Sequence, residues 1–198
     1  MTRRENLTKL LAEIRACRVC APYLPHGVRP IIRASRTAKI LIAAQAPGIR
    51  VHETGLSFND PSGDRLRDWL ALDRETFYDE SRISIVGMGF CFPGYTEAGA
   101  DKPPRPECAP LWQARLQAAL PRHTLTLAVG TYAINWYLGD VRKSTMTETV
   151  KAWREYDPAL MPLPHPSWRN NAWLKKNPWF EKKLLPDLRA RVRRALDL

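Results

Sequence analysis

The chain has 198 residues, of which 44% are hydrophobic and 26% charged, and its 31 Lys and Arg outnumber 20 Asp and Glu. This length is typical of one compact α/β domain, so we expect a single domain over residues 1–198. The sequence has no apolar run of membrane-spanning length and no apolar segment typical of a secretory signal, so we expect neither a transmembrane span nor a secreted protein. The net charge of +11 favours a polyanionic partner, with nucleic acid ahead of a membrane surface. We expect a soluble, cytoplasmic monomer.

The basic residues are concentrated near the end of the chain. From His165 to the C-terminus there are nine Lys and Arg against three Asp and Glu. Such a cluster is typical of a surface that contacts phosphates. Basic residues in a solvated last helix also complement the helix dipole, so charge alone leaves both interpretations open.

The apolar pattern predicts helices and strands in alternation. Leucine and isoleucine at helical spacing from Leu7 predict a helix over residues 5–16. The apolar run at residues 40–44 is too short for a helix and predicts a strand buried on both faces. The later elements expected by the same rules are a helix capped by Ser62, a strand at 83–86, a helix at 107–120, a strand at 125–129, helices at 131–138 and 146–155, an edge strand at 160–163 and a C-terminal helix opened by Asn177 and Pro178.

This alternation predicts an α/β fold, a three-layer α/β/α sandwich around a central, mostly parallel sheet of four strands. In such sheets ligands bind beyond the carboxyl ends of the strands. The first strand ends at Gln45–Gly48 and the last at His165–Ser167. The second is followed by a Gly- and Pro-rich stretch over residues 87–106, and long loops of this kind are usually functional. We therefore expect a site at this edge.

Four cysteines form a possible metal site. Cys17 and Cys20 form a C-x2-C pair, with two residues between them, whereas Cys91 and Cys108 are separated by sixteen residues. In a cytoplasmic chain disulfides are not expected, and a C-x2-C pair places two thiolates on one ion or cluster. A zinc ribbon usually has two tight pairs, and spread ligands suit a [4Fe–4S] cluster. Spacing alone leaves the cluster, zinc and four buried structural cysteines open.

Several motifs in order resemble the uracil-DNA glycosylase superfamily, and specifically its iron–sulfur branch of the family 4 and UDGX type, over nearly the whole chain. The cysteine spacing is similar to the cluster signature of that branch. Gln45–Gly48 resembles the end of its first motif, Gly-Glu-x-Pro-Gly, with Ala44 and Gln45 in place of Gly and Glu. Thr54–Phe58 resembles its Thr-Gly-x-Pro-Phe segment, and His165–Ser167 resembles its second catalytic motif.

The resemblance implies a DNA glycosylase that hydrolyses the N-glycosidic bond of uracil or another deaminated base, with DNA as partner and a [4Fe–4S] cluster as cofactor. A weak or inactive DNA-binding member of the fold and an enzyme acting on free nucleosides or nucleotides are the alternatives. The residues to which the resemblance gives roles are His165 as donor to the departing base, Gln45, Ala46, Pro47, Gly48 and Ser167 in substrate binding, Phe58 in base stacking, Trp168 and Arg169 on DNA, and Cys17, Cys20, Cys91 and Cys108 on the cluster. Lys175 and Lys176 belong to the basic C-terminal segment, and we expect them to contact DNA as well.

Other interpretations of these side chains remain open. Phe58 and Trp168 are also the residue types expected in ordinary packing, and a single histidine is more often structural than catalytic. In superfamily members with an Asp after the Gln, that Asp positions the attacking water, and here the place is taken by Ala46. The family's base-reading Asn falls near Gly87, which puts specificity for uracil in doubt.

Other groups must orient water if the chain is catalytic. Glu53 and His52 are the first candidates to orient water, because they flank the first motif, and Asp60 is a further candidate. Each of these three side chains is also a typical solvated loop residue.

Overall fold

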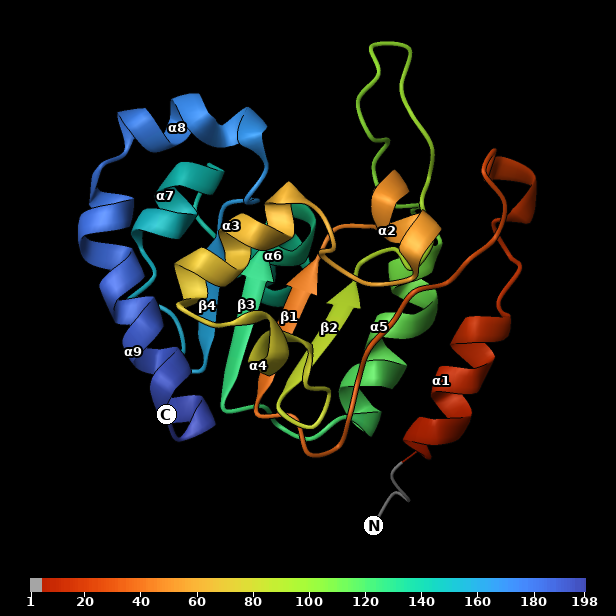
Figure 1. Cartoon of the computed structure of the whole chain (residues 1–198), viewed down its shortest axis with the longest axis horizontal. Helices are drawn as coiled ribbons and strands as arrows, with labels where there is room; N and C mark the ends of the chain where they lie inside the picture. Colours follow the sequence, from red (N-terminus) through yellow and green to blue (C-terminus); the bar gives the residue numbers. More distant parts are fainter. Residues whose placement is uncertain (1–4) are drawn as a thin grey trace.

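The computed structural model describes residues 5–198 and contains one parallel sheet of four strands in the order β2-β1-β3-β4. Figure 1 shows the strands side by side and pointing the same way. The strands are β1 (Ile40–Ala44), β2 (Ile83–Gly87), β3 (Leu125–Val129) and β4 (Leu160–Leu163). The predicted α/β sandwich is confirmed, and every strand pair is parallel.

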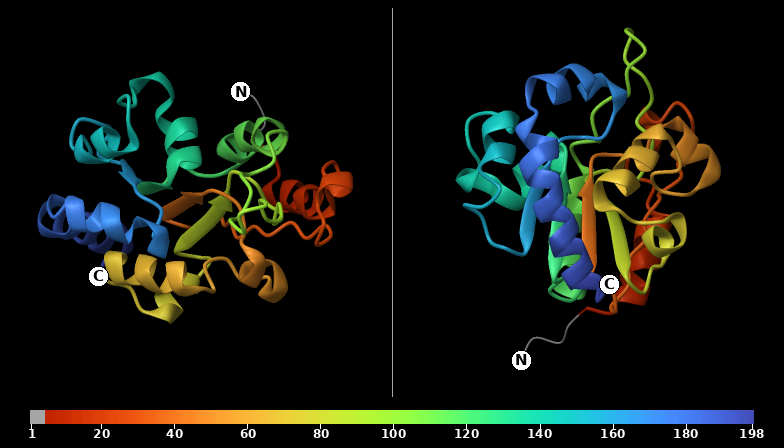
Figure 2. Two further views of the ribbon diagram at one scale, coloured as in Figure 1. Left: turned by 90° about the horizontal axis from the view of Figure 1, so that it is seen from above. Right: turned by 60° about the vertical axis from the view of Figure 1, so that its left-hand side comes forward.

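Helices cover both faces of this sheet. Figure 2 shows α3 and α4 on one face and α5 and α6 on the other, with α9 beside α3. The helices are α1 (Leu7–Ala16), α2 (Ile49–Thr54), α3 (Pro61–Leu70), α4 (Arg74–Tyr78), α5 (Cys108–Ala119), α6 (Thr131–Leu138), α7 (Met146–Lys151), α8 (Asn171–Lys176) and α9 (Leu185–Leu196). None of these helices is long and apolar enough to cross a membrane.

Burial explains why the strands are almost continuously apolar. Ile40, Ile42 and Leu127 are fully buried in a core shared with α3, α6 and α9. Leu41 and Val86 belong to a second apolar cluster beneath α1 and α5. Because both sheet faces are covered, neither face needs polar residues. β4 occupies an edge, where Pro162 removes a backbone donor at little cost.

The structure differs from the sequence prediction around α2 and α3. Residues 49–54, expected as a loop, form the short helix α2. The cap of α3 is Asp60 rather than Ser62, because the Asp60 carboxylate accepts a 2.8 Å hydrogen bond from the Gly63 N–H and Pro61 occupies the first turn. Near the C-terminus, a π-helical turn at Phe180–Leu184 precedes α9 and accommodates Pro186 at the start of that helix.

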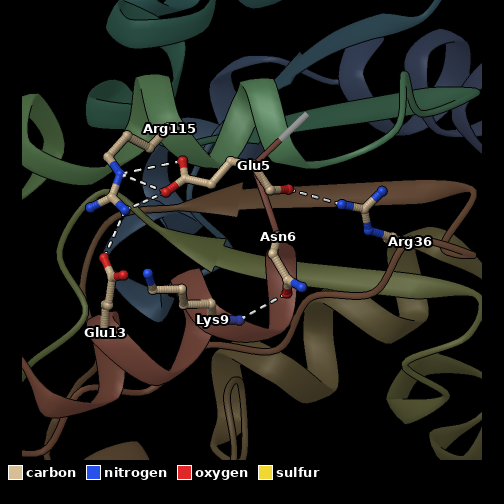
Figure 3. A network of polar contacts seen from close by, with 6 residues as sticks. All are labelled: Glu5, Asn6, Lys9, Glu13, Arg36 and Arg115. Carbon is tan, nitrogen blue, oxygen red and sulfur yellow. Dashed lines mark hydrogen bonds and ion pairs between the residues drawn. The ribbon is translucent and has the colours of Figure 1, made fainter. Parts of the chain in front are cut away.

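A cluster of charged side chains attaches α1 to α5 (Figure 3). The Arg115 guanidinium on α5 pairs with Glu5 and with Glu13, whose Oε2 lies 2.7 Å from Nη2. Asn6 caps α1 by accepting a hydrogen bond from the Lys9 N–H at 3.1 Å. These contacts hold α1 against α5, and each helix carries a cysteine at or next to one of its ends.

Arg115→Gln should lower the urea midpoint of unfolding near neutral pH, and the loss should shrink in high salt because the pairs are partly exposed. The hydrogen bond from Arg115 lowers the pKa of Glu5 below its ordinary value of 4.5. The stabilisation is therefore present above that value and is lost as the pH falls through the lowered pKa. Arg194→Gln removes the same charge from an exposed position on α9 and should leave the urea midpoint almost unchanged. Equal losses in the two variants would contradict a role for the pairing.

Candidate active site

One cavity of about 660 Å³ opens at the carboxyl edge of the sheet. The turn after β1, the loop after β2 and the segment after β4 all contribute to its walls, together with the start of α3. Of the sequence-predicted site residues, the structure brings the following to this cavity: Gln45, Ala46, Pro47, Gly48, Phe58, His165, Ser167, Trp168 and Arg169.

His165 is held in one orientation at the end of β4. Its Nδ1 accepts a hydrogen bond from the Ser167 N–H at 3.2 Å, and its carbonyl accepts one from the Asn170 amide at 2.7 Å. Burial lowers the pKa of the imidazole, so the ring is neutral at pH 7. Because Nδ1 is the acceptor, the proton of the neutral ring is on Nε2. His165 therefore presents an N–H donor.

Gly130, at the end of β3, lies against this histidine. A β-carbon on Gly130 would lie 3.4 Å from the His165 β-carbon, and the residue has a φ of +81°. The end of β3 therefore packs directly beside the imidazole.

Phe58 is buried in the cavity wall with an unusual backbone. Its φ of +56° is in the left-handed region, which costs a residue with a β-carbon of order 1–3 kcal/mol. Its carbonyl accepts hydrogen bonds from the Tyr78 hydroxyl at 3.0 Å and from Arg67 at 3.4 Å. A β-carbon on Gly63 would lie 1.7 Å from the same carbonyl. These contacts fix the Phe58 backbone, and with it the direction of the ring.

The turn after β1 is attached to the exit of β2. The Ala44 carbonyl accepts a hydrogen bond from the Met88 N–H at 2.8 Å, and the Gln45 carbonyl accepts one from Gly89 at 2.9 Å. Gly87 lines the cavity between them, and its carbonyl is bound by the Gln113 amide at 2.7 Å. The position near which the resemblance expects a base-reading amide therefore contributes backbone alone.

Within residues 5–198, two carboxylates reach the cavity, Asp60 and Asp101. Asp60 caps α3, as described above. Asp101 belongs to the loop after β2, which projects beyond the carboxyl edge of the sheet (Figure 1). Asp101 was not singled out from the sequence, and the only signal that pointed to it was the unusual length of that loop.

Cationic and aromatic side chains surround the cavity mouth. Trp168 is 68% exposed, and the Arg169 guanidinium lies 5.4 Å from its ring centroid. Arg65 on α3 lines the cavity and donates to the Ser167 carbonyl at 3.1 Å. Arg50 at the start of α2 also lines it. The sequence analysis missed Arg50 and Arg65, because nothing in the pattern of α2 or α3 distinguishes them from other surface arginines.

The structure does not bring His52 and Glu53 to the cavity. Helix α2 turns His52 away from it, so that Nε2 lies 3.0 Å from the His26 carbonyl oxygen. Glu53 is exposed, and its carbonyl accepts a hydrogen bond from Arg29 at 2.8 Å. Lys175 and Lys176 are exposed in the last turn of α8, also outside the cavity walls.

All four cysteines line a second, small cavity of about 30 Å³. Cys17 ends α1 and Cys108 begins α5, while Cys20 and Cys91 come from the adjoining loops. The other walls are mostly apolar, and burial raises the pKa of Cys91 to about 11 and that of Cys108 to about 12. Within residues 5–198, no three His, Cys, Asp or Glu side chains are grouped as a site for a single metal ion.

The parallel sheet and the large cavity at its carboxyl edge, lined by both polar and apolar side chains, define an α/β protein with a candidate ligand site at the strand ends. The family model of the uracil DNA glycosylase superfamily matches residues 33–189. The chain belongs to this superfamily, and its general function is that of a DNA glycosylase-like protein.

Tyr78→Phe tests how Phe58 is held. Removing the hydroxyl takes one donor from the Phe58 carbonyl, so we expect the free energy of unfolding to fall by about 1 kcal/mol in urea titrations. Tyr132→Phe on α6 is the matched control, because Tyr132 is 42% exposed, and its effect should stay within about 0.5 kcal/mol. A Tyr78→Phe variant as stable as the control would show that the contact does not hold the strained backbone.

Proposed function

We propose that the protein hydrolyses the N-glycosidic bond between deoxyribose and uracil or another deaminated base in DNA. The observation that carries this proposal is the shared cavity at the sheet edge, where the Gln45–Gly48 turn, Phe58 and His165 meet. A base in a duplex must leave the stack to be cleaved, and a pocket with an aromatic wall can receive it. The cavity has room for a nucleobase and part of its sugar.

His165 supplies the chemistry expected of this site. When the glycosidic bond breaks, its electron pair goes to the base, which leaves as an anion. The neutral imidazole donates its Nε2–H to a carbonyl oxygen of that anion, while its Nδ1 stays bound to Ser167. A fixed donor aimed at developing charge stabilises the transition state without reorganisation.

The cavity mouth has the composition of a DNA-binding surface. Arg50, Arg65 and Arg169 would contact phosphates on either side of the flipped nucleotide. Trp168 is exposed enough to enter the gap left in the stack. Lys175 and Lys176 would extend the phosphate contacts along α8.

The lack of an amide side chain at the exit of β2 bears on which bases the pocket can accept. An amide at the exit of β2 would read the uracil edge, and Gly87 offers no side chain for this. We therefore expect removal of several deaminated bases rather than uracil alone.

Single-turnover assays on oligonucleotides with uracil, hypoxanthine or xanthine test this activity, with strand cleavage in alkali as readout. The native protein should cleave at more than one of these bases, and His165→Ala should lower the rate at least about 100-fold. His26→Ala alters an exposed histidine outside the cavity and should keep the rate. Intact strands with every base would refute the activity.

Two other functions remain as alternatives. A DNA-binding protein without catalysis is favoured by Ala46 and Gly87, because both family side chains are missing there. It would bind DNA in a salt-sensitive way, with no cleavage and no effect of His165→Ala. An enzyme acting on free nucleosides or nucleotides would turn these over without affinity for DNA.

We also propose that the chain belongs to the iron–sulfur branch and that Cys17, Cys20, Cys91 and Cys108 hold a [4Fe–4S] cluster. One observation supports this proposal: all four thiols line one small, largely apolar cavity, so they can converge on a single group. The cluster would supply a cross-link between α1, α5 and the loop after β2.

Protein purified without oxygen should be brown and contain about four irons and four sulfides per chain. Cys17→Ser and Cys108→Ser should each lose the colour, whereas His165→Ala should keep it. Colourless protein with one zinc per chain would reject the cluster.

A further inference from the structure

We infer that Asp101 is the catalytic residue that binds the attacking water and accepts its proton. This inference rests on the proposed glycosidic hydrolysis and names the group that the first motif does not provide. Ala46 has no side chain that could orient water, and His52 and Glu53 lie outside the cavity. Among the described residues, Asp60 and Asp101 are the two carboxylates that line it.

The position of Asp101 suits this role. Its Oδ2 would lie 3.3 Å from a β-carbon placed on Gly48, so the carboxylate packs against the turn after β1. Asp101 thus reaches the cavity from the projecting loop, whereas His165 reaches it from the end of β4. A substrate between them would have its base donor on one element and its water ligand on another.

The loop holds Asp101 in place through its backbone. Tyr95 and Asp101 form an antiparallel bridge, and the Lys102 N–H donates to the Gly94 carbonyl at 2.8 Å. The Thr96 N–H donates to the Ala100 carbonyl at 2.7 Å, on the other side of Asp101. The Tyr95 ring packs edge-on against Phe92 with centroids 5.1 Å apart. The loop is therefore anchored at its base, next to the catalytic cavity.

The Asp101 carboxylate is also free to bind water. It forms no hydrogen bond or ion pair with any side chain in residues 5–198, whereas an oxygen of Asp60 is engaged by the Gly63 N–H. Although Asp101 is exposed, the cavity walls partly desolvate it and raise its pKa; Arg169 opposes this rise and Asp60 adds to it. A carboxylate with a raised pKa is the stronger base.

The step balances without a further reactant. The bond from C1′ to the base nitrogen breaks, and its electron pair leaves with the base. The water oxygen bonds to C1′, and one proton of that water goes to the Asp101 carboxylate. Asp101 then returns this proton to solvent or to the departed base.

Single-turnover rates of Asp101→Asn, Asp60→Asn and Glu97→Gln on a uracil oligonucleotide test the assignment. Asp101→Asn should lower the rate at least about 100-fold while DNA affinity is kept. Asp60→Asn preserves the helix cap, since asparagine caps helices well, and its single-turnover rate should fall much less than that of Asp101→Asn. Glu97→Gln removes a charge from the exposed tip of the same loop and should keep the native rate.

Chemical rescue separates a catalytic role from a structural one. In Asp101→Gly, added formate should restore part of the lost rate, because a small carboxylate can occupy the vacated place. A native rate in Asp101→Asn, or a large loss confined to Asp60→Asn, would overturn the assignment and leave the glycosylase activity standing. A native protein that cleaves no damaged base would instead refute the proposed function.

Discussion

Parallel strand pairing is the constraint on which the rest of the structure depends. The register pairs Ala44 with Gly87 and Val129 with Leu163, so all four strands end at nearly the same level. Every segment that leaves a strand end therefore emerges beside the others. Phe58, Asp101 and His165 are far apart in the sequence and line one cavity for this reason. The buried apolar strands fix the site, although none of their side chains carries the proposed chemistry.

Close backbone packing then gives the site its rigidity. Gly63 allows α3 to approach the Phe58 carbonyl, and the end of β3 at Gly130 packs against His165. Hydrogen bonds to the Phe58 carbonyl and to the His165 ring complete the restraint. The ring of one residue and the donor atom of the other are thereby oriented before any ligand arrives, so binding does not bear the cost of ordering them.

The sequence was informative where local patterns are long or distinctive. Strands such as residues 40–44 and 125–129 were predictable from continuous apolar runs, and motif order pointed to His165 and Phe58. The placement of His52 and Glu53 was not predictable, because α2 has six residues and is too short to show helical periodicity. Asp101 was not predictable either, since it reaches the cavity through a bridge between loop residues that share no local pattern. The Asp60 cap shows a third case, where Ser62 fits the same local rule equally well.

Gly87 bears on how this pocket can change over evolutionary time. A β-carbon there would lie 2.4 Å from the Gly89 carbonyl oxygen and 3.1 Å from that of Gln45. Any larger residue, asparagine included, would require the backbone between β2 and the following loop to move first. A substitution at Gly87 alone therefore does not place an amide in this part of the cavity without a backbone shift. Acquiring an amide at this position would therefore require this segment to be remodelled as well.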